Sequence, residues 1–134
     1  MQRKFFPPHF PLKMLHAIIV PALLVLTIGA GSQGKKIPSS EAKNHIGESC
    51  TVCGLVASTR YLETAKGSPT FLNLGKAYPN QECTVLIRGR NRVKFGKPED
   101  EYSGKRICVS GVIDEYKSQP QVEASEKSQI TVEP

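Results

Sequence analysis

The chain has 134 residues and a formal net charge of +6 at pH 7, from 18 basic and 12 acidic side chains. That length suits one domain. Three of the basic residues lie in the first 32, and without them the charge falls to about +3, well short of the strongly basic proteins that package nucleic acid.

Residues 1–32 form a segment unlike the rest of the chain. They contain three basic residues and no acidic one, and the apolar run 17–28 (AIIVPALLVLTI) is followed by small residues up to Ser32. A positive start, an apolar run of about 7–15 residues and a small-residue exit are typical of a secretion signal. We therefore expect a signal peptide over 1–32 rather than a membrane anchor, which needs about 20 apolar residues.

Removal of this segment leaves 15 basic and 12 acidic residues, a net charge of about +3. The expected product is an exported protein, periplasmic or secreted, with no stable membrane span. All four cysteines remain in it, and an even number in a small exported domain favours disulfides. Cys50 and Cys53 lie in a β-branched pattern rather than at a helix start, and Cys83 and Cys108 lie far apart. We therefore expect neither redox chemistry nor a metal or other cofactor.

The remaining sequence predicts five strands separated by turn residues. Residues 33–40 are polar and interrupted by Pro38, which predicts a linker ahead of one domain over 41–134. A serine pair then predicts a short helix over 41–45. Strands are expected at 49–61, 70–74, 82–88, 106–116 and 121–124, and a helical turn within 96–104.

The first and fourth of these strands are long, and each has an interior glycine, Gly54 and Gly111. Closing a sheet into a barrel needs strong bends, which glycines or bulges supply. Five strands with a helical insertion between the third and fourth match the order of the OB-fold. The sequence therefore predicts an all-β, five-stranded OB-fold barrel, with a short helix before strand 1 and a helical turn between strands 3 and 4.

This strand order bears on the cysteines, for which four residues allow three pairings. Strands 1 and 4 are neighbours in an OB-fold, which suggests a Cys53–Cys108 bridge. Cys50 and Cys83 begin strands 1 and 3 at the same end of the barrel. We expect them to form the second bridge.

Five short runs form a recognisable pattern: 53–60 (CGLVASTR), 69–74 (PTFLNL), 78–80 (YPN), 84–87 (TVLI) and 104–111 (GKRICVSG). Together they resemble a family of exported bacterial OB-fold domains that are taken to bind nucleic acid. The likeness spans about 37–130, which is nearly all of the expected mature chain. Where that family often has an aromatic residue, this chain has Arg88.

A second, more distant likeness rests on the order G-x-V-x-x-x-R…F-x-N-L, found here at Gly54, Val56, Arg60, Phe71, Asn73 and Leu74. It is similar to the anticodon-binding OB domain of class II aminoacyl-tRNA synthetases. In that family the first-strand arginine and the second-strand phenylalanine contact bases. The resemblance implies the same roles for Arg60 and Phe71.

OB folds bind their ligands on the face of strands 2 and 3. Alternation along strand 2 puts its leucines in the core and leaves Phe71 and Asn73 outside. In an extended strand 3, the arginines at alternate positions from Arg88 onward would share that outer side. The candidate nucleic-acid-binding residues are Arg60, Tyr61, Phe71, Asn73, Arg88, Arg90 and Arg92.

Two alternatives compete with this site. The basic run is also typical of a solvated edge, and Phe71 would enter the core if the strand register slipped by one. The other aromatic residues that we expect in the core or at its rim are Tyr78, Phe95, Tyr102 and Tyr116.

Catalysis is not expected. A nuclease needs clustered carboxylates for a metal, whereas the dense acidic run here, 99–101, lies in a turn and Asp114 and Glu115 point to opposite faces of a strand. The sequence therefore predicts a binding protein for single-stranded nucleic acid. The alternative is a periplasmic domain for a small ligand, an oligosaccharide or a protein partner.

Overall fold

The computed structural model describes residues 34–134, so the expected signal peptide lies outside the described residues. Within the described part, no helix is long and apolar enough to cross a membrane. The strands are β1 (Lys35–Pro38), β2 (Ser49–Tyr61), β3 (Thr70–Leu74), β4 (Cys83–Ile87), β5 (Arg106–Tyr116), β6 (Gln119–Glu123) and β7 (Ile130–Val132). The helices are the 3-10 helices η1 (Ser39–Asn44) and η2 (Lys127–Gln129) and the short α-helices α1 (Gly89–Arg92) and α2 (Pro98–Glu101).

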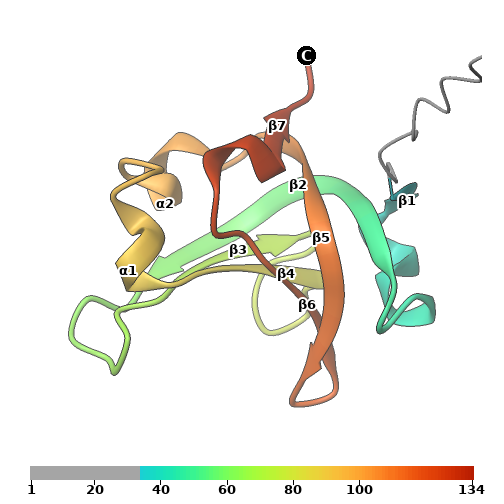
Figure 1. Cartoon of the computed structure of the whole chain (residues 1–134), viewed down its shortest axis with the longest axis horizontal. Coiled ribbons are helices and arrows are strands. Elements are labelled where there is room, and N and C mark those ends of the chain that lie inside the picture. The colour runs from blue at the N-terminus through green and yellow to red at the C-terminus, as the bar shows by residue number, and fades with distance from the viewer. Residues whose placement is uncertain (1–33) are drawn as a thin grey trace, which may run out of the picture.

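Five of the strands close into a ring in the order β2-β3-β4-β6-β5 and back to β2. All pairs in the ring are antiparallel except β4 with β6, which are parallel. The long, curved β2 and β5 run across the molecule, with α1 and α2 beside the ring (Figure 1). The protein is thus mostly β, with an OB-like strand order, as the sequence predicted.

The ring closes because β2 and β5 pair with each other as well as with β3 and β6, respectively. The first half of β2 pairs with β5, and its second half pairs with β3 after a register shift between Val56 and Ser58. Gly111 permits close packing in β5, since a Cβ there would come within 2.8 Å of the Val122 side chain. A Cβ at Gly54 of β2 would lie 2.6 Å from Ser39 Oγ, so both interior glycines lie where neighbouring segments approach closely.

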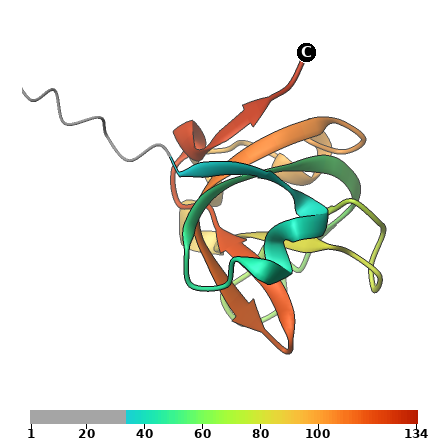
Figure 2. The same ribbon diagram turned by 90° about the vertical axis from the view of Figure 1, so that its right-hand side faces the viewer.

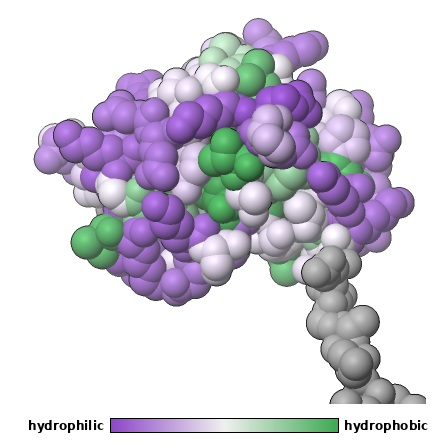
Figure 3. All heavy atoms as spheres, turned by 90° about the horizontal axis from the view of Figure 1, so that it is seen from above, coloured by the Kyte–Doolittle hydropathy of each residue, from purple (hydrophilic) through white to green (hydrophobic). Residues whose placement is uncertain are grey.

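The core is filled by alternate residues of the ring strands. Leu72 and Leu74 of β3 and Val85 and Ile87 of β4 have no exposed surface. Figure 3 shows one outer face, which is largely hydrophilic with a small hydrophobic patch near its middle. This inside–outside alternation is the one that period-two strands produce.

Residues 35–40 of the expected linker 33–40 belong to the fold and do not form a free linker. Residues Lys35–Pro38 form β1, which pairs in parallel with β2, and Ile37 of this strand is buried in the core at 2% exposure. The helix η1 then starts at Ser39, two residues before its expected start, and contacts β2, β4 and β6. Figure 2 shows β1 and η1 together on one side of the ring.

The end of the chain also differs from the sequence prediction. The strand expected at 121–124 is β6, which starts two residues earlier. A further strand, β7, follows η2 and pairs with β5 opposite Ile107–Val109. It has only three residues, which is too short to show a clear alternation.

The third strand ends at Ile87, and the following residues form α1 rather than a continued strand. Gly89 donates its N–H to the carbonyl oxygen of Gly67 at 2.9 Å, and a Cβ at this position would lie 2.5 Å from that oxygen. This close contact with the loop before β3 turns the chain out of the sheet. The expectation of an extended basic run after Arg88 is therefore wrong.

One of the two expected disulfides is present. Cys53 and Cys108 face each other across β2 and β5 and are joined, with their Cα atoms 4.0 Å apart. Cys50 and Cys83 are free and buried, so the second bridge is not formed. Cys50 lies between β1 and β5, whereas Cys83 pairs with Leu74 of β3. Burial raises the pKa of both free thiols, that of Cys83 to about 12.

Candidate nucleic-acid interface

A groove runs over the outer face of β3 and β4. Its larger part, the main pocket, has a volume of about 670 Å³. Residues from the end of β2, from β3, from the loop between β3 and β4 and from the β5–β6 hairpin line it. Its lining residues include Ser58, Arg60, Phe71, Asn73, Tyr78, Gln81, Thr84, Tyr116, Lys117, Gln119 and Gln121.

A second hollow of about 330 Å³, the basic pocket, continues the groove toward α1. It shares Phe71, Tyr116 and Gln121 with the main pocket. Its own lining includes Lys66, Leu86, Arg88 and Arg90. The two pockets therefore form one continuous groove with a mainly neutral end and a basic end.

The floor of the main pocket is a hydrogen-bonded network. Asn73 donates to Ser58 Oγ at 3.1 Å and accepts from Thr84 Oγ1 at 3.2 Å. Ser58 Oγ also accepts the backbone N–H of Tyr78 at 3.0 Å. Asn73 is only 4% exposed. Its side chain thus ties three strands together and holds the loop that bears Tyr78, instead of being free to bind a ligand.

Three aromatic residues line the groove. Phe71 is half-buried, whereas Tyr78 and Tyr116 are 68% and 57% exposed. The sequence prediction that Tyr78 and Tyr116 pack in the core or at its rim is therefore wrong, although Phe95 and Tyr102 are in the core. The sequence did contain a signal for the exposure of Tyr78 and Tyr116, which is that each lies beside a turn. Pro79 follows Tyr78, and two residues with positive φ follow Tyr116.

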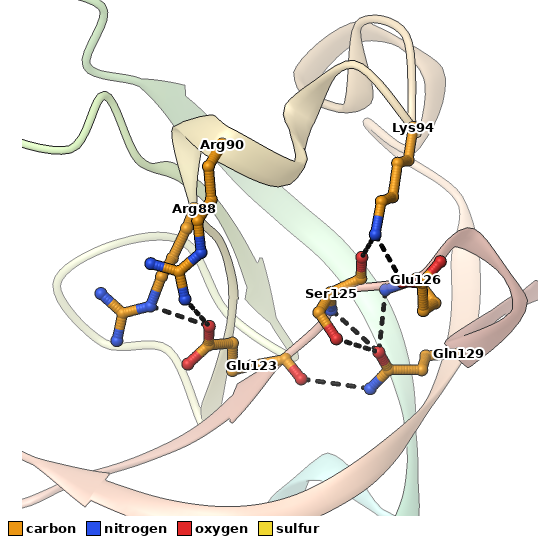
Figure 4. A network of polar contacts seen from close by, with 7 residues as sticks. All are labelled: Arg88, Arg90, Lys94, Glu123, Ser125, Glu126 and Gln129. Carbon is orange, nitrogen blue, oxygen red and sulfur yellow. Dashed lines mark hydrogen bonds and ion pairs between the residues drawn. The ribbon is translucent and has the colours of Figure 1, made fainter.

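Cations surround the groove, but some of them are already paired. Arg60, Lys66 and Lys117 are exposed. Arg88 Nε lies 2.8 Å from Glu123 Oε1, and Arg90 Nη2 lies 3.9 Å from the same oxygen. Figure 4 shows both arginines directed at this carboxylate. Glu123 therefore partly neutralises the basic pocket.

Gln129 anchors the segment that follows Glu123. Its side chain donates to the backbone carbonyl of Glu123 and accepts from the backbone N–H groups of Ser125 and Glu126 (Figure 4). It also donates to the backbone carbonyl of Ser110. Lys94 contacts Glu126 in the same network. Because this backbone is held at several points, Glu123 is presented to the arginines from a fixed position.

Two predicted site residues lie elsewhere. Arg92 stacks over the Tyr61 ring, with its Cζ 3.9 Å from the ring centroid, and pairs with Glu99. Neither Tyr61 nor Arg92 lines the groove. For Arg92 the reason is α1, because a helical turn does not keep alternate residues on one side. Tyr61 follows Arg60 in β2, so its side chain points to the opposite face of the strand. Of the seven predicted residues, the groove brings together Arg60, Phe71, Asn73, Arg88 and Arg90.

The acidic run 99–101 takes part in ion pairs. Glu99 pairs with Arg92, and Glu101 Oε1 lies 3.4 Å from Lys127 Nζ. These contacts hold α2 against its neighbours. Neither of these two glutamates lines the groove.

Comparison with known proteins gives a likeness of fold. No protein-family model and no curated protein matches the sequence. The OBody AM1L10 bound to hen egg-white lysozyme has a TM-score of 0.50 at 18% identity, covering 72% of this chain and 90% of that chain.

Two solved synthetases are also similar, with lower scores. A putative aspartyl-tRNA synthetase from Leishmania major Friedlin has a TM-score of 0.49 at 13% identity over 74% of this chain. The aspartyl tRNA synthetase from Entamoeba histolytica has a TM-score of 0.48 at 15% identity over 73%. This chain spans 20% and 21% of their lengths. The comparisons, through the OBody, agree with an all-β, OB-like fold.

Proposed function

We propose that this domain binds single-stranded nucleic acid in the groove over β3 and β4. The observation that carries the proposal is the combination of Tyr78, Phe71 and Tyr116 with bordering cations in one continuous groove. Proteins that bind single strands combine these two features, since aromatic faces stack on bases and a positive track follows the phosphates.

The two ends of the groove suit different parts of a nucleic-acid strand. In the main pocket, the exposed rings of Tyr78 and Tyr116 offer faces for bases. In the basic pocket, Lys66, Arg88 and Arg90 offer charge for phosphates. Phe71 lies between the two, where a base at the junction would stack. Asn73 acts as a positioning residue because its hydrogen-bonding groups are already used.

We further propose that the protein is exported and acts as a binder rather than as an enzyme. The buried Cys53–Cys108 disulfide is compatible with an oxidising compartment. Periplasmic or secreted location and the signal over 1–32 rest on the sequence pattern.

A second candidate ligand is an oligosaccharide. The main pocket has three side-chain amides of glutamine, Gln81, Gln119 and Gln121, beside its tyrosines. Neutral hydrogen-bonding groups next to aromatic faces suit a sugar, whose hydroxyls need partners but whose ring is uncharged. An uncharged oligosaccharide would make little use of the cations in the basic pocket. Its binding should therefore depend little on salt concentration, whereas binding of nucleic acid should weaken as salt rises.

The test is binding of labelled single-stranded DNA, RNA and a glycan panel to the purified protein at two salt concentrations. For nucleic acid, Tyr78→Ala and Tyr116→Ala should each weaken binding roughly tenfold, because stacking contributes about 1–3 kcal/mol per base. Arg88→Ala should weaken binding to all sequences and reduce the salt slope by about 1. Val93→Ala is the control, because this exposed residue lies outside the groove.

Two results would reject the proposal. One is unchanged nucleic-acid affinity when Tyr78 and Tyr116 are both alanine. The other is absence of binding at low salt. Glycan binding that depends on the tyrosines but not on Arg88 or salt would favour the second candidate.

A further inference from the structure

A turn and the start of a strand bring together three potential metal ligands at a place separate from the groove. They are His45, Glu48 and Cys50. His45 Nδ1 contacts Glu48 Oε2, and the ligand atoms of all three residues lie within 4.8 Å of one another. The other such cluster among residues 34–134 contains Cys53 and Cys108, whose sulfurs are already joined.

The backbone holds this turn in place. Glu48 donates its N–H to the carbonyl oxygen of His45 at 3.0 Å, and Gly47 between them has a φ of +87°, which favours glycine. Two further hydrogen bonds join the turn to β5. They run from Gly47 N–H to Ile113 O at 2.7 Å and from Ile113 N–H to Glu48 O at 2.9 Å. The first two ligands are therefore presented from a fixed loop.

The third ligand comes from the ring itself. Cys50 lies in β2, where it pairs with Gly111 of β5 and with Lys35 of β1, and it is 2% exposed. The side chain of His45 is 18% exposed and that of Glu48 is 58% exposed. The cluster is therefore closed on the side of the core and open to solvent beside Glu48, which gives an ion a route of entry.

We propose that His45, Glu48 and Cys50 bind one Zn²⁺ ion, with the fourth position of the ion open to water. An imidazole nitrogen, a carboxylate oxygen and a thiolate sulfur are the three donor types that zinc uses in proteins. The thiolate and the carboxylate together balance the charge of the ion. On binding, the Cys50 thiol loses its proton to solvent as the sulfur–zinc bond forms.

The geometry of the whole cluster distinguishes this proposal from a simple ion pair. A pair between His45 and Glu48 accounts for two of the three groups and gives Cys50 no part. A metal ion accounts for all three, including a free thiol beside an imidazole and a carboxylate. The sequence pattern did not reveal it, because His45 stands alone near a helix end and Cys50 appeared to belong to a disulfide.

The test uses the full protein with its disulfide intact, titrated with Zn²⁺ and, separately, with Co²⁺. We expect one ion per chain and a near-ultraviolet thiolate-to-cobalt absorption band that Zn²⁺ removes. Cys50→Ala should abolish the band. His45→Ala and Glu48→Gln should weaken zinc binding by about 100-fold or more, since even loss of an outer-shell partner costs about 10–100-fold.

Matched controls separate the site from the rest of the chain. Cys83→Ala removes the other free thiol, and Glu63→Gln removes an exposed carboxylate of a loop; both should leave the band and the affinity unchanged. Zinc should also slow the alkylation of Cys50, whereas Cys83, which has no exposed surface, should be unaffected by the ion. No stoichiometric binding, or binding that survives Cys50→Ala, would overturn the proposal, even if nucleic-acid binding in the groove is found.

Discussion

Removing the Cys53–Cys108 disulfide should lower the stability of the domain substantially. The bridge spans a sequence separation of 55 residues. The chain-entropy model for a loop of that size predicts a loss of about 4 kcal/mol in the free energy of unfolding when the link is absent. Measured values are more often about 2–4 kcal/mol. For a domain of this size, that corresponds to a fall of roughly 10–30 °C in the melting temperature.

The variant to compare is the protein with both Cys53→Ala and Cys108→Ala, which replaces two nearly buried residues with small apolar ones. Guanidinium unfolding and calorimetry under non-reducing conditions give the free energy and the melting temperature. Ser110→Ala is the control, because it removes the Thr51–Ser110 contact between the same two strands without cutting a covalent link. Its expected cost is about 0.2–1 kcal/mol.

A loss below about 1 kcal/mol in the double variant would refute this reasoning. It would mean that the unfolded chain is not restricted by the bridge, or that β2 and β5 are held so firmly by the other pairings that the link adds little. The dependence of the free energy of unfolding on denaturant concentration separates the two explanations. A steeper dependence in the double variant would mean that the bridge does restrict the unfolded chain, because a bridged unfolded state exposes less surface.

Glu123→Gln should raise the affinity for single strands several-fold and steepen its salt dependence, because Arg88 and Arg90 lose their partner in the groove, whereas Glu126→Gln, next to Lys94, should not. Lower affinity in oligonucleotide titrations would contradict this. Arg92→Ala should lower the free energy of unfolding in urea by about 2 kcal/mol without affecting binding, since it leaves the largely buried Glu99 without its ion-pair partner. A loss of affinity would restore Arg92 to the site. The raised pKa of Cys83, about 12, means that the folded protein holds this proton more tightly than the unfolded one, so its contribution to stability is complete below about pH 9 and disappears as the pH rises toward 12. Unfolding at about pH 8 and about pH 11 should therefore show a smaller pH dependence in Cys83→Ala than in the wild type, and equal dependence would contradict the assignment.

Much of the ring could be predicted because local alternation is strong where a strand has one face in the core. Leu72 and Leu74 of β3 and Val85 and Ile87 of β4 are all fully buried, as their spacing indicates. The neighbouring positions Phe71 and Asn73 then face the groove. The face on which each of these residues lies could therefore be predicted without any information on distant contacts.

The basic run after β4 could not be predicted in the same way. It contains no alternating apolar residues, and its path depends on the contact between Gly89 and Gly67, which are 22 positions apart in the sequence. That contact starts α1 and sends Arg92 to Tyr61 and Glu99. Burial of Ile37, which makes β1 part of the fold, likewise depends on the presence of β2 beside it.

By itself, the sequence determined the all-β class and the five ring strands, and through the expected strand order it suggested Cys108 as the partner of Cys53. The reason is that these follow from period-two patterns and from the adjacency of two long strands. Only the tertiary structure decided which side chains meet. It brought Tyr78 and Tyr116 to one groove from separate turns, left Cys50 free beside His45 and Glu48, and opposed Glu123 to two arginines. Such meetings depend on how loops close across the ring, which no local pattern encodes.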